Sequence, residues 1–287
     1  MKRQIKHRIF CFSGWAGTGK DECAKRLITH HKAVQTGLAD AGKRHAADVY
    51  EFSEQQLWGP SQFRNAGDPR YPKPILRSVT LEPVISKYPN KYSSSKNLHI
   101  VDYPKEASWD FSHLAQISEN DPRYFLSPRE LLQQYLDLLN NLYETTWIER
   151  GIRDHRAIAA GTHTYSRTVG LIPSTDPHPV SITCFSDFRY LHEHRAIKTQ
   201  LKLDFIPILI RIKRPSCPSP PYSHVSETEQ TRIPDRLYDF IISNDQSLEH
   251  LYEQVDRIVT ITSSQDFVSK SWDEALISPD PSNEYFQ

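Results

Sequence analysis

The chain has 287 residues, enough for one elaborated domain with a substantial hydrophobic core. Lysine plus arginine and aspartate plus glutamate each total 35, so no overall basic field favours nonspecific binding to nucleic acid. The four cysteines include no pair at the spacing of a zinc site or a redox motif. The apolar stretch at residues 9–12 is too short for a signal-peptide core or a membrane span. We therefore expect a cytoplasmic protein without a membrane partner or direct contact with nucleic acid.

The first elements are a strand and a helix joined by a glycine-containing loop. Residues 8–13 (RIFCFS) form a short apolar run, which is typical of a buried parallel strand. Residues 21–31 carry apolar side chains at helical spacing, with acids in the first turn and basic residues in the last. Residues 58–110 are rich in Pro, Tyr, Ser and Asn without clear periodicity, which predicts an irregular insertion.

The second half of the chain predicts a long helix and further strands. Residues 128 to about 150 have leucines at helical spacing, with Ser127 as the expected cap and Pro128 in the first turn. Residues 180–185, 205–212 and 240–242 are compact β-rich runs separated by helical segments, which predicts parallel strands with crossovers. From about residue 263 the chain is polar and contains prolines, which predicts a loose tail.

The strongest motif is GWAGTGKD at residues 14–21, which matches G-x-x-x-x-G-K between the expected strand and helix. Glycines let a backbone wrap a phosphate, the helix N-terminus binds the anion, and Lys20 neutralises the β and γ oxygens of ATP. A glycine-rich turn with a solvated lysine is the alternative, and the flanking elements disfavour it. Asp21 replaces the usual Ser or Thr and is expected to hold Mg²⁺ directly or through water. The predicted ATP-binding residues of the loop are Gly14, Gly17, Thr18, Gly19, Lys20 and Asp21.

The loop ending Gly-Lys-Asp resembles that of the phage-type deoxynucleoside monophosphate kinases and is more distantly similar to that of animal-type phosphomevalonate kinases. Further segments follow in the order of the phage family: QLWGPS at 56–61, RN at 64–65, DPRYP at 68–72, SPRE at 127–130, SDFRY at 186–190, IKRP at 212–215, HVSE at 224–227 and ISND at 242–245. The resemblance extends over about residues 8–260. It implies a three-layer α/β P-loop kinase fold with a central parallel sheet. The implied kinase domain covers residues 1–262, with an acceptor-side insertion at about 50–125 and a short lid at about 214–230, and residues 263–287 form the tail.

Asp187 and Arg189 are candidate catalytic residues together with Lys20. Asp187 follows an apolar run, and open α/β sheets bind ligands beyond the carboxyl ends of their strands. A carboxylate there can orient magnesium-bound water or accept the acceptor's proton. Arg189 can clamp a substrate phosphate with two hydrogen bonds. A surface Asp/Arg pair at a strand end is the alternative that the residues alone leave open.

Basic residues elsewhere are candidates for the acceptor phosphate. These predicted acceptor-binding residues are Lys43, Arg64, Arg129 and Arg189, although a solvated side chain is the usual state of Lys and Arg. The thirteen histidines show no metal-ligand spacing, and we assign them no metal.

Two residues near the C-terminal strands complete the predicted ATP site. Arg214 begins the lid expected to cover the nucleotide phosphates, although the prolines that follow also suit an ordinary surface loop. Asn244 is expected to cap the last helix, and by the resemblance its loop borders the adenine of ATP.

The resemblance implies transfer of the ATP γ-phosphoryl group to a (deoxy)nucleoside monophosphate, with Mg²⁺, by positioning and charge neutralisation. Two alternatives stay open: a kinase of another acceptor, such as phosphomevalonate or a modified base, and a nucleotide-binding regulator that has lost catalysis. In the family a Gly-Thr-Glu-Trp-Gly-Arg-like segment continues the central helix, whereas this chain has QYLDLLNNL at 134–142. That departure predicts a narrow or atypical range of acceptors. The sequence also leaves open whether the chain forms a homodimer.

Overall fold

The structure is a computed structural model that describes residues 7–73, 124–143, 145–200, 205–217, 229–230, 233–264 and 266–270. The chain divides into two compact units, Met1–Glu51 with Gln134–Gln287 and Phe52–Gln133. The predicted insertion at about 50–125 overlaps the second unit. Its residues 74–123 lie outside the described residues, as do residues 218–228 of the predicted lid and residues 271–287 of the predicted tail.

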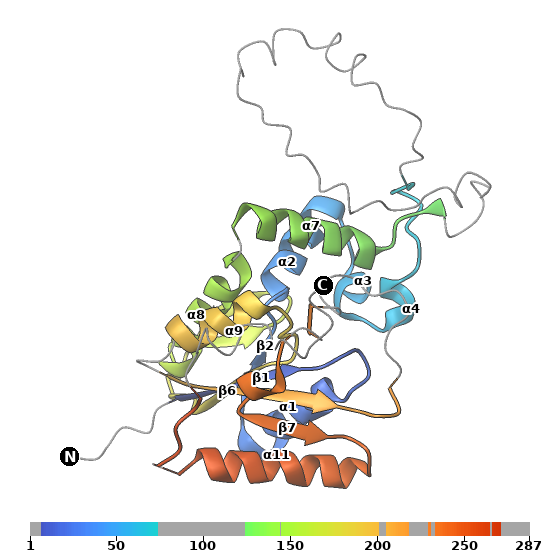
Figure 1. Ribbon diagram of the computed structural model, residues 1–287. Coiled ribbons are helices and arrows are strands. Elements are labelled where there is room, and N and C mark those ends of the chain that lie inside the picture. The colour runs from blue at the N-terminus through green and yellow to red at the C-terminus, as the bar shows by residue number, and fades with distance from the viewer. Residues whose placement is uncertain are drawn as a thin grey trace. The chain divides into compact units, whose positions relative to one another are not determined.

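A five-stranded parallel sheet forms the centre of the first unit (Figure 1), as the sequence predicts. Its strand order is β2-β5-β1-β6-β7, and each neighbouring pair is parallel. The strands are β1 His7–Ser13, β2 Val34–Thr36, β5 Ile182–Phe185, β6 Phe205–Lys213 and β7 Phe240–Ser243. Strand β1 is the central one, and all seven of its residues are buried.

Helices cover both faces of this sheet. Alternate residues of a strand point to opposite faces, and Phe10 and Phe12 pack with α1 (Lys20–His31) and α11 (Leu248–Thr262). Ile9 and Cys11 contribute to a second cluster with α8 (Thr146–Ala159) and α9 (Leu191–Gln200). The unit is therefore a three-layer α/β structure with one apolar core on each side of the sheet.

The chain reverses its direction across the sheet next to β1. It runs from β1 through α1 to β2 at the edge, returns to β5, and crosses to β6 and β7 on the other side of β1. Because crossovers between parallel strands are right-handed in nearly all proteins, this reversal places α1 and α9 on opposite faces. Ligands of open α/β sheets bind at such a switch point, beyond the carboxyl ends of the strands. The loops that follow β1 and β5 flank this point.

The second unit contains short helices and the start of a longer one. Helix α3 (Glu54–Trp58) begins with a capping box in which Ser53 and Gln56 bond reciprocally, and α4 (Ser61–Arg64) follows. Sequence analysis predicted irregular structure from residue 58, so the turn of helix in α4 was missed. The chain segments on either side of residues 74–123 come together, since Pro72 and Phe125 form an isolated β-bridge.

The long helix predicted from residue 128 to about 150 is two helices, α7 (Pro128–Leu142) and α8. Ser127 caps α7 as predicted, because its Oγ accepts from Glu130 N at 3.2 Å and Glu130 Oε2 accepts from Ser127 N at 2.7 Å. The break follows from local chemistry. Thr146 Oγ1 donates to the backbone carbonyl of Tyr143 at 2.7 Å, and such side-chain bonds compete with helical ones.

Several elements lie where the sequence analysis specified none. They are α2 (Asp40–Tyr50), the antiparallel hairpin of β3 (His163–Ser166) and β4 (Gly170–Pro173), and the short helix η3 (Asp235–Leu237).

Part of the predicted loose tail is packed against the sheet. Phe267 stacks on Phe240 with ring centroids 6.0 Å apart, and Lys270 N donates to Asp239 Oδ1 at 2.7 Å. Among the residues that the structure describes, none of the helices combines the length and the apolar character needed to cross a membrane.

Candidate functional site

The loop between β1 and α1 has a backbone that only glycine adopts without strain. Gly14, Gly17 and Gly19 have φ values of 146°, 82° and 108°. A Cβ atom on Gly14 would lie 2.6 Å from the carbonyl oxygen of Ile212, and one on Gly19 would lie 2.7 Å from Asn244 Nδ2. Gly19 is also the N-cap of α1 and supplies no side-chain cap to the first N–H groups of the helix. The N–H groups in the first turn of a helix suit an anion.

Lys20 folds back onto this loop. Its side chain is buried, and Nζ donates to the carbonyl oxygens of Gly14 at 2.5 Å and Trp15 at 2.6 Å. The ammonium group is thus held against the loop by charge-assisted hydrogen bonds. Asp21 is exposed on the first turn of α1.

Three later segments of the chain converge on the loop. Gln230 Oε1 accepts from Gly14 N at 2.9 Å, and Asn244 Nδ2 donates to the carbonyl oxygen of Thr18 at 2.8 Å. Arg214 Nη1 donates to the carbonyl oxygen of Gly17 at 3.2 Å. The predicted ATP-site residues Arg214 and Asn244 therefore both contact the loop. Gln230 carried no sequence signal, because a lone glutamine belongs to no motif.

The predicted capping role of Asn244 is wrong. The N-cap of α11 is Ser247, whose Oγ accepts from His250 N at 3.2 Å. Both residues are good N-cap formers, so residue type alone does not separate them. The amide of Asn244 is engaged by the loop instead.

A pocket of about 350 Å³ opens beside the loop, at the carboxyl end of β6. It is lined by Gly14, Trp15, Thr18, Arg211, Ile212, Lys213, Arg214, Pro215 and Gln230. The lining includes three cationic residues and the aromatic residue Trp15. Asp235 forms ion pairs with both Arg211 and Lys213.

Asp187 directly follows Ser186 at the carboxyl end of β5, as sequence analysis predicts for a strand end. Its two carboxylate oxygens accept from the backbone N–H groups of Leu38 at 3.0 Å and Ala39 at 3.1 Å. The carboxylate therefore fixes the turn that follows β2. A carboxylate offers about four acceptor positions, so these two bonds leave room for a further donor or ligand.

The segment after Asp187 is organised by Glu193. Glu193 Oε2 accepts from the backbone N–H groups of Arg189 at 2.6 Å and Tyr190 at 2.8 Å. Burial raises the pKa of Glu193 to about 8, against the opposite effect of these two N–H donors. Glu193 thus fixes the backbone from which Arg189 projects.

Lys43 belongs to the turn at the start of α2. Its Nζ lies 3.8 Å from Asp40 Oδ1, and Asp40 is completely buried. The first unit therefore contains Lys20, Lys43, Asp187 and Arg189, together with the loop. The sequence did not identify Asp40 as important.

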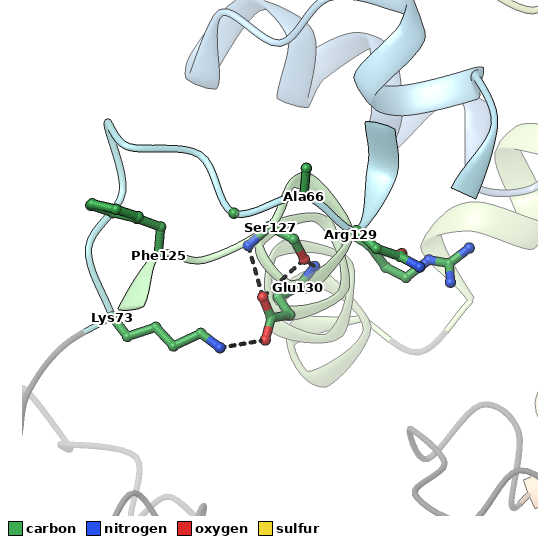
Figure 2. A pocket seen from close by; sticks show the side chains of 8 residues that line it. Ala66, Lys73, Phe125, Ser127, Arg129 and Glu130 are labelled. Carbon is green, nitrogen blue, oxygen red and sulfur yellow. Dashed lines mark hydrogen bonds and ion pairs between the residues drawn. The ribbon is translucent and has the colours of Figure 1, made fainter. Parts of the chain in front are cut away.

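The second unit has a pocket of its own, of about 470 Å³ (Figure 2). Its wall includes Phe125, residues 65–67 and the first turn of α7. Lys73 and Ser127 both point toward Glu130, whereas the side chain of Arg129 extends away from them (Figure 2). The Lys73 Nζ–Glu130 Oε1 distance is 3.1 Å.

The predicted acceptor residues Arg129 and Arg64 both belong to this second unit. Arg129 lines the pocket of this unit. Arg64 is the residue directly before Asn65, which also lines that pocket. Arg64 Nη2 donates to Ser61 Oγ at 3.3 Å, and its Nε is buried without a hydrogen-bond partner among the described residues.

No group of three or more His, Cys, Asp or Glu side chains that could hold a metal ion occurs within the described ranges. A Mg²⁺ ion that is bound mainly by substrate phosphates and waters needs only one or two protein ligands. Asp21, which is exposed on the first turn of α1, fits that arrangement. Comparison with known protein families and with curated proteins finds no match to this chain.

Proposed function

We propose that this protein is an ATP-dependent nucleoside monophosphate kinase of the P-loop type. The observation that carries the proposal is the loop between β1 and α1: three glycines with positive φ, an uncapped helix N-terminus and Lys20, all at the switch point of a parallel sheet. At Gly14 and Gly19 a Cβ atom would collide with Ile212 and Asn244, so glycine is required for the loop to keep this backbone. Glycine loops of this kind suit the close approach of a phosphate to backbone N–H groups.

In this proposal the loop binds the β and γ phosphates of ATP, and Lys20 leaves the carbonyl oxygens of Gly14 and Trp15 to bind phosphate oxygens. Asp21 would hold Mg²⁺, which would supply charge neutralisation at the ATP phosphates. Arg214 and Asn244, which already touch the loop, would flank the nucleotide.

The carboxyl end of β5 supplies the candidate groups for the reaction itself. Asp187 would orient the acceptor or a magnesium-bound water, and Arg189 would bind the acceptor phosphate. The acceptor class, a (deoxy)nucleoside monophosphate, rests on the resemblance of the ordered motifs to the phage-type kinases. The altered segment at 134–142 leads us to expect a narrower range of acceptors than that family has.

The experiment is an assay of ADP release from Mg·ATP with dTMP, dGMP, dCMP, dAMP and base-modified monophosphates. We expect at least one acceptor to be used by the wild type and by Lys25→Ala, a control on the exposed side of α1. The Lys20→Ala variant should lose that activity. Tight ATP binding without turnover on any acceptor would instead favour a nucleotide-binding regulator, and turnover on phosphomevalonate alone would change the acceptor class.

A further inference from the structure

A cluster of charged side chains surrounds Asp40 where the turn after β2 meets the β3–β4 hairpin. Asp40 is completely buried, and its Oδ2 accepts a hydrogen bond from the hydroxyl of Tyr165 at 3.2 Å. Arg167 Nε lies 3.5 Å from the same oxygen, and Lys43 Nζ lies 3.8 Å from Oδ1. A buried carboxylate without such partners destabilises the folded state. The position of Asp40 therefore fixes the positions of these donors.

The cluster has more positive than negative charge. Arg44 joins it, because its Nη1 donates to the carbonyl oxygen of Arg167 at 2.9 Å and to Tyr165 Oη at 3.4 Å. Lys43 and Arg167 thus both approach the carboxylate of Asp40, and Arg44 contacts Arg167 and Tyr165. The side chain of Arg167 is 45% exposed while that of Asp40 is fully buried, so a positive group faces solvent and the negative group does not.

The cluster lies close to the proposed reaction centre within the same unit. Asp40 follows Leu38 and Ala39, whose N–H groups are bound by Asp187. In the sheet, β2 is separated from β1 by β5 alone. Neighbouring strands are about 4.8 Å apart, so the turn that carries Asp40 begins about 10 Å from the loop that carries Lys20. Asp187 lies just after the carboxyl end of β5, the strand that separates them.

We infer that the β3–β4 hairpin is an acceptor-recognition element, in which Arg167 and Lys43 bind the phosphate of the acceptor nucleotide and Asp40 positions both cations. This inference rests on the proposed kinase function. Lys43 is already an acceptor candidate from the sequence, whereas no motif indicates Arg167 or Asp40. The inference also supplies an arginine for the acceptor in a chain whose segment 134–142 has none. Arginine presents a planar pair of donors that suits phosphate oxygens.

Two glycines are consistent with this arrangement of the cluster. A Cβ atom on Gly37 would lie 2.8 Å from Asp40 Oδ2, so the Asp40 side chain folds tightly over that backbone. Gly170 has a φ of 97°, and a Cβ atom there would lie 3.3 Å from the guanidinium of Arg44. Larger residues at either position would displace the groups that hold Arg167.

The decisive variant is Arg167→Gln, because the side chain is partly exposed and its loss should not prevent folding. Losing one charge-assisted contact to phosphate should raise the KM for the monophosphate about tenfold or more, with little change in the KM for ATP. Arg257→Gln is the matched control, an exposed arginine on α11 at the opposite face of the sheet. An unchanged monophosphate KM in Arg167→Gln, with normal turnover in the wild type, would overturn the inference and leave the kinase proposal intact.

A binding measurement separates phosphate recognition from general damage and from failure of the kinase proposal. Calorimetric titration with dTMP, dGMP, dCMP and dAMP is compared with titration by the matching nucleosides. We expect Arg167→Gln to lose about tenfold in affinity for the bound monophosphate and nothing for its nucleoside. That result would support the inference even if no acceptor is phosphorylated. Equal monophosphate affinity in the variant and wild type, or no monophosphate binding by the wild type, would overturn it.

Asp40→Asn tests the positioning role. It should raise the monophosphate KM while leaving the KM for ATP unchanged, since Asp40 acts through Lys43 and Arg167 rather than by touching the acceptor. A lower melting temperature with an unchanged monophosphate KM would mean that Asp40 only stabilises the hairpin. If Asp40→Asn does not fold, Arg167→Gln alone decides the inference.

Discussion

Replacing Gly19 with alanine tests the backbone geometry of the loop. Combining it with Asn244→Ala tests whether the two residues are in contact. Gly19 has φ 108° and ψ 11°, and a left-handed backbone costs a residue with a Cβ atom roughly 1–2 kcal/mol. The new Cβ atom would also lie 2.7 Å from Asn244 Nδ2 and 3.3 Å from Leu251 Cδ2. The Asn244 amide must move, which breaks its 2.8 Å bond to the carbonyl oxygen of Thr18.

That bond contributes about 0.5–1.5 kcal/mol to the free energy of unfolding. Gly19→Ala should therefore lower this free energy by about 2–3 kcal/mol, and Asn244→Ala by about 1 kcal/mol. In the double variant the clash with the amide is gone and the bond is lost only once. We expect the two effects to fall short of additivity by about 1 kcal/mol.

Urea denaturation of the wild type, both single variants and the double variant measures this coupling, and titration with Mg·ATP measures the function of the loop. Gly19→Ala should weaken ATP binding, because the first N–H groups of α1 are displaced. Additivity within about 0.3 kcal/mol would show that Asn244 does not contact the loop at Gly19, and the reasoning would fail.

The remaining predictions concern three charged side chains. Lys20→Ala should lower turnover roughly 100-fold or more. It should also lower the free energy of unfolding by about 1–3 kcal/mol, because the carbonyl oxygens of Gly14 and Trp15 lose their donor. Steady-state kinetics and denaturation compare this variant with Lys25→Ala. Asp187→Asn should lower the turnover number more than ATP affinity and destabilise the fold by about 1–3 kcal/mol, since an amide nitrogen cannot accept from a backbone N–H; unchanged stability would argue against the bonds to Leu38 and Ala39. The pKa of Glu193 is raised to about 8, so the folded protein favours the protonated side chain. The contribution of Glu193 to the free energy of unfolding is therefore fully present below about pH 4.5 and is lost as the pH rises through 8. Glu193→Gln should therefore gain stability relative to the wild type as the pH rises from 5 to 8, by about 1 kcal/mol per pH unit; a pH-independent difference would contradict the raised pKa.

The strong local signals in the sequence predicted the central strand, the first helix and the start of α7. Residues 9–12 are all apolar, as expected for a strand buried on both faces. Ser127 with Glu130 is a capping box that forms from local contacts alone. The short strand Val34–Thr36 and the hairpin at 163–173 carry too few residues for a clear period. Their positions depend on pairing with segments that are distant in the chain.

In the candidate site, too, only the residues with a strong local signal could be identified from the sequence. The glycines and Lys20 form a contiguous motif whose chemistry is readable from spacing. Gln230, Asp40 and Arg167 act through contacts between residues more than 100 positions apart, such as Gly14 with Gln230 and Asp40 with Arg167. Nothing in their local sequence distinguishes them from ordinary polar residues. The choice between Asn244 and Ser247 as a helix cap likewise depended on where the loop at Thr18 lies.

The most direct test of the kinase proposal follows the phosphoryl group itself. ATP labelled with ³²P in the γ position is incubated with the protein, Mg²⁺ and each monophosphate, and the products are separated by chromatography. The proposal predicts that the label appears in the β position of the acceptor's diphosphate, and that this product is absent with Lys20→Ala. Label that is released only as inorganic phosphate, or that stays in ATP with every acceptor, would contradict phosphoryl transfer to a monophosphate.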